Sequence, residues 1–254
     1  MHPRGEPAAS RRGGRPAGRR ERRGCGTPRS GERELQPARK LRLDPDTLRR
    51  PSPLLAREQA VIGERGQALA GVYDAILNED RDAWDEIERD VRRTFPAVDR
   101  LGLTPASDKT KVLQIRLAEG TWVPAAQVSE GLLYWLAFAA LPHVSPARVL
   151  VVEEPENGLH PARIRDVVRV LRRVSEGGTQ VLLATHSPLV VNELAPHEVS
   201  VVTRPRALGT QVRRLSDLPD LDRLLSVYSL GELWLAYADG QDEAGLFAPQ
   251  RDAG

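Results

Sequence analysis

The stretch VLVVEEPENGLHP, residues 149–161, decides the fold. It opens with four consecutive apolar residues, three of them β-branched, which predict a strand buried on both faces in a parallel sheet. The strand ends at Glu153 and Glu154, the position at which α/β sheets place their sites. Adjacent acids are costly to bury unless a cation or a reaction uses them. The alternative is that the two acids only begin a surface loop.

Strands and helices alternate on the carboxyl side of this stretch. After Pro146 the pattern predicts strands at 149–152, 180–184 and 199–203, with helices at 161–175 and from Pro188 onward. On the amino side it predicts helices at 57–78 and 80–95 and short strands at 112–117 and 122–124. Alternation of this kind is typical of parallel strands joined by crossover helices, so we expect an α/β fold.

A second informative segment is VSEGLLYWLAFAAL, residues 128–141. Ser129 and Gly131 stand directly before an apolar helix, where a hydroxyl and free backbone N–H groups can bind an anion. Ser-Glu-Gly before a helix is also an ordinary capping sequence.

A third segment is VLLATHSP, residues 181–188, an apolar strand that ends in Thr185, His186 and Ser187. A neutral imidazole at a strand end can hydrogen-bond a phosphate or a water near neutral pH. A histidine in this position is otherwise structural.

Together the three segments resemble, in the same order, the signature, Walker B and switch regions of ABC-like AAA ATPases of the SMC, RecF and OLD kind. The resemblance covers residues 54–240 and is most specific over 129–188. It implies a P-loop NTPase-like (ABC ATPase-type) fold with a mostly parallel sheet and flanking helices, and ATP and Mg²⁺ as cofactors. Glu153 is then the acid on the metal side and Glu154 the general base. The family usually has Asp at the first position, so Glu153 is a departure.

The resemblance also implies a paired site. Ser129 and Gly131 would contact the γ-phosphate held by the opposite subunit, and His186 would bond that phosphate or the attacking water. Such heads form homodimers or heterodimers and act on DNA or on a partner nuclease. The residues implied to lie near the seam between two heads are Asn157, Gly158 and His160.

The sequence contains no Gly-x-x-x-x-Gly-Lys-Ser/Thr loop of the kind whose amides and lysine cradle phosphates. Gly13, Gly14 and Gly18 lie among arginines, with no strand before them. We therefore expect a fold that is incomplete at the N-terminus, with no edge strand for residues 149–152 to pair with. We also expect weak or absent ATP hydrolysis, because positioned donors contribute orders of magnitude to the rate.

The charge is unevenly distributed. Residues 1–50 carry 15 Lys or Arg against 6 Asp or Glu, which leaves 22 basic and 29 acidic residues in the remainder. We divide the chain into an Arg-rich disordered head (1–50), an ATPase domain (51–240) and a tail (241–254). The head is either an arm that binds nucleic-acid phosphates, or a solvated tail or sequence foreign to the domain.

Composition narrows the classes of protein. The longest apolar run, near residues 132–141, is shorter than the roughly 20 residues of a membrane span, so we expect no membrane partner. Cys25 is the single cysteine, which excludes an internal disulfide and favours a cytoplasmic location. The ATPase hypothesis keeps two alternatives: a non-catalytic dimerisation partner or truncated remnant, and nucleic-acid binding through the head.

Overall fold

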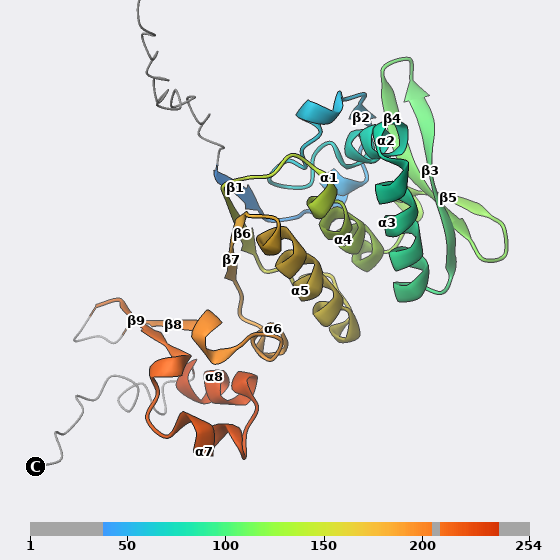
Figure 1. Ribbon diagram of the computed structural model, residues 1–254. Coiled ribbons are helices and arrows are strands. Elements are labelled where there is room, and N and C mark those ends of the chain that lie inside the picture. Colours follow the sequence, from blue (N-terminus) through green and yellow to red (C-terminus); the bar gives the residue numbers. More distant parts are fainter. Residues whose placement is uncertain (1–37, 205–208, 239–254) are drawn as a thin grey trace, which may run out of the picture. The chain divides into compact units, whose positions relative to one another are not determined.

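The computed structural model describes residues 38–204 and 209–238 (Figure 1). The strands are β1 (Ala38–Leu41), β2 (Ser52–Pro53), β3 (Val98–Ser107), β4 (Thr110–Leu117), β5 (Trp122–Pro124), β6 (Val149–Glu153), β7 (Gln180–Ala184), β8 (Ser200–Thr203) and β9 (Gln211–Arg214). The α-helices are α1 (Pro45–Leu48), α2 (Leu69–Glu79), α3 (Arg81–Thr94), α4 (Glu130–Ala139), α5 (Pro161–Glu176), α6 (Pro188–Val191), α7 (Leu221–Leu225) and α8 (Leu230–Ala238).

The central sheet is parallel and has the order β1-β6-β7. Leu150 of β6 lies between Arg39 of β1 and Val181 of β7, and the three strands run in the same direction. Helix α5 connects β6 to β7, as expected for a crossover. The predicted α/β class with a parallel sheet and flanking helices is therefore confirmed.

Strand β1 corrects two sequence-based expectations. Residues 149–152 do have a neighbour, because β1 pairs with them along its full length. The segment 38–50, which we assigned to the disordered head, instead forms β1 and α1 of the fold. The reason is hydrophobic burial: Leu41 and Leu48 are each only 2% exposed and belong to the main core. The arginines around them hid this short apolar pattern.

A second, antiparallel sheet has the order β2-β4-β3, with β5 also paired to β4. Helices α2 and α3 pack beside β3 and β4 (Figure 1). Helix α3 buries Trp84, Ile87 and Val91, the stripe that the sequence predicted. Strand β3 was missed, because Gly102 and Pro105 interrupt its alternation of apolar and polar residues.

The predicted helix at 57–78 is only partly correct. Residues 57–59 form one short 3₁₀ turn, and the α-helix starts at Leu69. Gly66 and Ala68, with φ angles of 94° and 67°, turn the chain just before the helix begins. Such left-handed backbone is incompatible with a continuous helix.

Helix α4 lies in the core, with residues 132–139 all buried, and it contacts α5. The C-terminal segment has a small core of its own around Val199, Val201 and Leu215. There β8 and β9 form an antiparallel hairpin, and α6 contacts α8. The tail 241–254 and the first 37 residues of the head lie outside the described residues.

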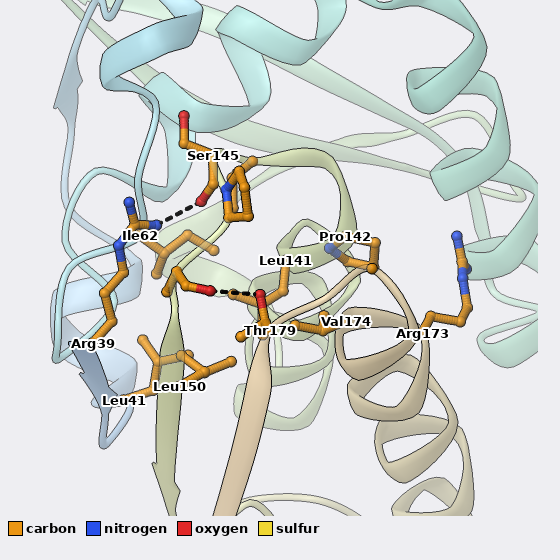
Figure 2. A pocket seen from close by; sticks show the side chains of 14 residues that line it. Arg39, Leu41, Ile62, Leu141, Pro142, Ser145, Leu150, Arg173, Val174 and Thr179 are labelled. Carbon is orange, nitrogen blue, oxygen red and sulfur yellow. Dashed lines mark hydrogen bonds between the residues drawn. The ribbon is translucent and has the colours of Figure 1, made fainter. Parts of the chain in front are cut away.

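A small cavity of about 80 Å³ lies at the amino ends of the central strands (Figure 2). Leu41, Ile62 and Leu150 line it, and Thr179 closes one side by donating a hydrogen bond to the Ala147 carbonyl (2.8 Å). Arg39 donates to the Ser145 carbonyl (2.8 Å), and burial lowers its pKa. This cavity is at the opposite end of the strands from the carboxylates of β6.

Among residues 38–204 and 209–238, no helix has the length and apolar character needed to cross a bilayer.

Candidate functional site

The backbone makes a sharp turn where β6 ends. Glu154 has a φ of 48°, in the left-handed region that non-glycine residues rarely occupy. Its N–H donates to the Ala184 carbonyl of β7 (2.8 Å), which fixes the turn against the neighbouring strand. A strained residue held in this way is common at functional sites. The turn places Glu153 and Glu154 at the carboxyl edge of the sheet.

Glu153 is paired with two cations, Lys40 on β1, the strand that the sequence did not predict, and Arg42 directly after it. Lys40 Nζ lies 3.0 Å from one carboxylate oxygen, and Arg42 lies 3.8 Å from the other. The hydrogen bond from Lys40 to Glu153 raises the pKa of the Lys40 ammonium. The alternation of Lys40 and Arg42 with Leu41 and Leu43 is a period-two signal that could have predicted this strand.

Glu154, at the end of β6, faces His186, which follows the end of β7. His186 Nε2 lies 3.6 Å from Glu154 Oε1, and the imidazole is 87% exposed. Desolvation raises the pKa of Glu154, and its interaction with the neighbouring carboxyl group of Glu156 raises it further. A carboxylate with a raised pKa is a stronger base, as a general base requires.

Glu156 lies beside Glu154, so Glu153, Glu154 and Glu156 form an acidic cluster at the end of β6. Thr185 binds this cluster through Glu156. Thr185 Oγ1 donates to Glu156 Oε1 (2.7 Å) and accepts from the Ser187 N–H (2.9 Å). The other oxygen of Glu156 is buried and has no partner in the described structure. A buried polar atom without a partner needs an explanation, and a bound water or ion would supply one.

Ser129 and Gly131, which the sequence predicts to be signature residues, lie in a separate hollow of about 470 Å³. Ser129 caps α4 by position, yet its hydroxyl makes no capping hydrogen bond. Gly131 faces Gly158 so closely that a Cβ at Gly131 would lie 2.9 Å from the Gly158 carbonyl oxygen. Gly158 itself has a φ of 71° and packs against the ring of Tyr134. Both glycines are therefore required by close approach of the backbone.

Asn157 and His160, which we predicted to lie near a seam between two heads, have different roles in the described structure. Asn157 is exposed and donates its backbone N–H to the Glu154 carbonyl (3.0 Å). His160 Nδ1 accepts from the Ala162 N–H (3.2 Å), which makes His160 the N-cap of α5. Arg163 lies over the Phe95 ring at 5.3 Å in the same hollow.

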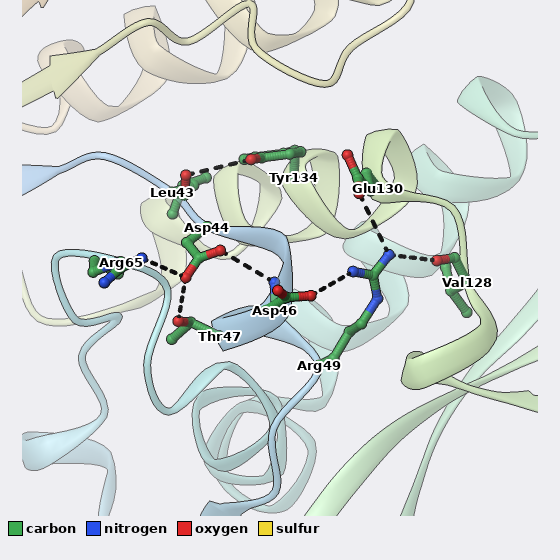
Figure 3. Close-up of polar contacts among 9 residues, drawn as sticks. All are labelled: Leu43, Asp44, Asp46, Thr47, Arg49, Arg65, Val128, Glu130 and Tyr134. Atoms are coloured by element: carbon green, nitrogen blue, oxygen red, sulfur yellow. Dashed lines mark hydrogen bonds and ion pairs between the residues drawn. The ribbon is translucent and has the colours of Figure 1, made fainter.

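Residues just after β1 hold the start of α4 in place (Figure 3). Arg49 bridges Asp46 (3.3 Å), the Val128 carbonyl (3.4 Å) and Glu130 (3.9 Å). Tyr134 of α4 donates to the Leu43 carbonyl (3.3 Å). The segment that we assigned to the head from the sequence therefore positions the start of α4, next to Ser129.

Asp44 organises the loop that precedes α1. It accepts from the Thr47 hydroxyl and from Arg65, each at 2.8 Å. The hydrogen bond from Thr47 is the main cause that lowers the pKa of Asp44. The Asp44 carboxylate therefore serves local structure. Glu153 and Glu154, at the carboxyl edge of the sheet, are the carboxylates that are candidates for catalysis.

The structure thus brings the predicted residues into two groups joined by one loop. Glu153, Glu154 and His186 form the first at the carboxyl edge, and the second surrounds Ser129 and Gly131. Within the described ranges, no set of three His, Cys, Asp or Glu side chains is arranged to hold a metal ion. Two hard oxygen donors, Glu153 and Glu154, suit Mg²⁺ by type, because this ion keeps several waters and takes one or two carboxylates.

The family follows from comparison with known proteins. Residues 39–192 match the model of the family described as "AAA domain, putative AbiEii toxin, Type IV TA system". The chain belongs to this family. The match begins inside β1 and ends after α6, so it includes both groups of candidate residues. Comparison with curated proteins gave no significant match.

Several solved structures are similar to this AAA domain. One is from a study of ATP-driven dimerisation and DNA-stimulated activation of SMC ATPases (12% identity, 61% of this chain and 94% of that chain, TM-score 0.45). Another is the SMC head domain from Thermotoga maritima (18%, 57% and 51%, TM-score 0.39). A third is an Smc head bound to the C-terminal winged-helix domain of ScpA (15%, 72% and 56%, TM-score 0.48). The chain thus spans little more than half of the second and third structures.

Proposed function

We propose that this AAA domain supplies the base, the histidine and the signature serine of an ATP-hydrolysing site that is completed by a phosphate-binding loop from outside its residues. The observation that carries the proposal is the strained Glu154, whose carboxylate faces His186 at the carboxyl edge of β6 and β7. Family membership gives the class of ligand, a nucleoside triphosphate with Mg²⁺.

Each residue has a role that its surroundings support. Glu154 takes the proton of the attacking water, because desolvation and Glu156 raise its pKa. The exposed imidazole of His186, 3.6 Å away, hydrogen-bonds the same water or the terminal phosphate. Glu153 holds the metal side, and its ion pairs with Lys40 and Arg42 orient its carboxylate. Mg²⁺, when bound, neutralises phosphate charge at this edge.

The signature group supports a second, paired role. The Ser129 hydroxyl makes no capping hydrogen bond at the N-terminus of a ten-residue helix, next to the close packing of Gly131 against Gly158. This is a suitable contact for an anion held by another head. The proposed assembly is therefore a homodimer or heterodimer of heads. A role in DNA repair or defence, action on DNA or a partner nuclease, and binding through the Arg-rich head all stay predictions.

The test is ATP turnover with Mg²⁺ by the purified chain, alone and mixed with a family member that has an intact phosphate-binding loop. We expect little or no turnover by the chain alone and an increase in the mixture. Glu154→Gln removes the base, so the increase should fall by about 10²- to 10⁴-fold. The matched control is Glu176→Gln, an exposed acid on α5, which should leave the increase unchanged.

The same assay separates the two functions. An increase that survives Glu154→Gln but is lost in Ser129→Ala would show a non-catalytic partner that acts only through its signature hollow. No increase at saturating concentrations of both proteins would contradict both roles.

A further inference from the structure

The loop between β6 and α5 contains an asparagine followed by a glycine. The chain has three asparagines, and Asn157 precedes Gly158, whereas Asn78 and Asn192 each precede a glutamate. In an Asn-Gly pair the backbone nitrogen of the glycine can attack the side-chain amide carbon of the asparagine, because no Cβ on the glycine shields that nitrogen. Asparagine is one of the thermolabile residues of proteins. The pair is therefore a candidate for a spontaneous covalent change.

The surroundings of Asn157 leave this reaction open. The residue is exposed, and its side chain makes no hydrogen bond within the described residues. The Gly158 N–H likewise donates to no acceptor in this part of the chain. The loop is held on the amino side of the pair, where the Asn157 N–H donates to the Glu154 carbonyl (3.0 Å). Neither the attacking nitrogen nor the amide carbon has to give up a hydrogen bond before they react.

The other two asparagines are exposed as well, but their side chains are held. Asn78 Nδ2 donates to the Asp74 carbonyl one turn earlier in α2 (2.8 Å). Asn192 Oδ1 accepts from the Gly231 N–H (2.6 Å). Asn78 and Asn192 therefore serve as internal references, because they share the exposure of Asn157 and lack its free side chain and its glycine.

We propose that Asn157 is a site of spontaneous deamidation through a cyclic succinimide. The Gly158 nitrogen forms a bond to Asn157 Cγ, the Cγ–Nδ2 bond breaks, and ammonia leaves with the proton that the Gly158 nitrogen has lost. Water then opens the ring. Its attack at Cγ gives an aspartate at this position, and its attack at the main-chain carbonyl carbon gives an isoaspartate, whose backbone runs through the former side chain. Both products carry a carboxylate in place of a neutral amide.

The packing around Gly158 makes the isoaspartate product consequential. A Cβ at Gly158 would lie 2.4 Å from the ring of Tyr134, whose hydroxyl is held by the Leu43 carbonyl (Figure 3). On the same loop, the Gly158 carbonyl lies against Gly131, as described above. An isoaspartate inserts one extra backbone carbon directly before Gly158, and close-packed neighbours have no space to absorb it. The modification therefore displaces the start of α4.

The new charge acts on the same place. Gly158 lines the hollow of Ser129 and Gly131, so the carboxylate forms one residue away from this hollow. A negative charge there opposes the binding of an anion. The loss of anion contact in this hollow rests on the proposed function, whereas the modification and the displacement of α4 do not.

The first experiment follows the full folded chain during incubation at mildly alkaline pH, with digestion and peptide mass spectrometry at intervals. Deamidation raises the mass of a peptide by the difference between water and ammonia, and chromatography separates the aspartyl and isoaspartyl forms. Asn157 should deamidate at least tenfold faster than Asn78 and Asn192. A smaller ratio would overturn the proposal.

The same chain unfolded in urea separates the effect of the loop from that of the dipeptide. In the folded chain, Asn157 should deamidate at a rate within tenfold of its rate in urea, because the loop leaves both reacting atoms free. Slowing of more than tenfold by the fold would contradict the proposal.

A matched pair of variants tests the consequence for α4. Asn157→Gln should stay unmodified, because a longer side chain would have to close a larger ring, and Asn78→Gln should deamidate at position 157 as the parent does. Residue-resolved hydrogen exchange is then compared in aged samples. The Leu133 amide, which bonds to the Ser129 carbonyl, should exchange at least tenfold faster in aged parent than in aged Asn157→Gln. Equal exchange would contradict the displacement of α4. If Asn157→Gln fails to fold, fresh parent chain takes its place in this comparison.

These readouts need no nucleotide, so they fail separately from the proposed function. In the mixture with an intact family member, the increase in ATP turnover should fall in proportion to the fraction of Asn157 converted. An increase that survives full conversion would contradict the loss of anion contact. No increase with fresh chain would contradict the proposed function and leave the mass and exchange results standing.

Discussion

The two edges of the central sheet differ sharply. At the β1 edge, Leu41 is buried beside Leu150, and Lys40 reaches across to Glu153. After β1, the backbone N–H groups of Arg42 and Asp44 donate hydrogen bonds to the carbonyls of Glu64 and Arg65. At the β7 edge, the backbone faces a slot of about 790 Å³ lined by residues 181–186 and 198–204, and Leu182 is half exposed.

The difference indicates which part of the sheet the chain completes by itself. Burial of leucines stabilises the β1 side. The segment beyond β7 is held by a smaller apolar cluster of Ile164, Val168 and Val190, and by ion pairs such as Arg172–Glu198. Among the described residues, the sheet has two edge strands, β1 and β7: β1 pairs with residues 149–152, which we had expected to have no neighbour, and the edge beside His186 belongs to β7. The candidate catalytic groups lie at the carboxyl ends of β6 and β7.

The largest expected effect compares one leucine from each side. Leu41→Ala should lower the free energy of unfolding by about 2–5 kcal/mol, because it leaves a cavity in the core. Leu182→Ala should lower it by less than about 1 kcal/mol, because half of that side chain is already in water. Urea denaturation followed by circular dichroism measures both. Equal losses would show that the β7 side is covered in solution.

A smaller effect compares two buried threonines. Thr179→Val removes the hydrogen bond to the Ala147 carbonyl beside the closed cavity and should cost about 1–3 kcal/mol. Thr203→Val removes a hydroxyl that has no partner at the slot, and should be neutral or stabilising by up to about 1 kcal/mol. The same denaturation assay applies. A clear loss in Thr203→Val would mean that the slot is already occupied in the free chain.

The smallest effect concerns the ion pair at the rim of the slot. The hydrogen bonds from Arg172 lower the pKa of Glu198 to about 2. A depressed folded-state pKa gives stability that is present above the usual value of 4.5 and is lost as the pH falls toward 2. Glu198→Gln should therefore cost up to about 1 kcal/mol at pH 7, and nothing near pH 2. Thermal melts across this pH range measure the cost of the substitution. A cost that does not change with pH would contradict the ion-pair explanation and assign the loss to packing.

Much of the parallel sheet could be predicted from the sequence, because apolar runs bounded by turn residues indicate buried strands and helices without any tertiary information. β6, α5 and β7 were all predicted near their observed bounds for this reason. β1 was not, since the middle two of its four residues are basic and it lies within an arginine-rich segment. Its burial comes from tertiary contacts with Leu150 and Ile62, which no local pattern contains.

The candidate site was only partly accessible from sequence. Glu153, Glu154 and His186 could be proposed because each directly follows or ends an apolar strand. Lys40, Arg42 and Glu156 could not, because their contribution depends on which strands are neighbours. The capping role of His160 also needed the geometry of α5, since a histidine before proline has no distinctive sequence signal.

The most direct test of the open edge is residue-resolved hydrogen exchange in the free chain. Leu182 and its neighbours Val181 and Leu183 lie on one strand and differ chiefly in the side to which their amides point. We predict that the Leu182 amide, which faces β6, exchanges at least about 100-fold more slowly than the amides of Val181 and Leu183. Similar protection at all three amides would contradict an unpaired β7 edge and, with it, a site that is completed from outside.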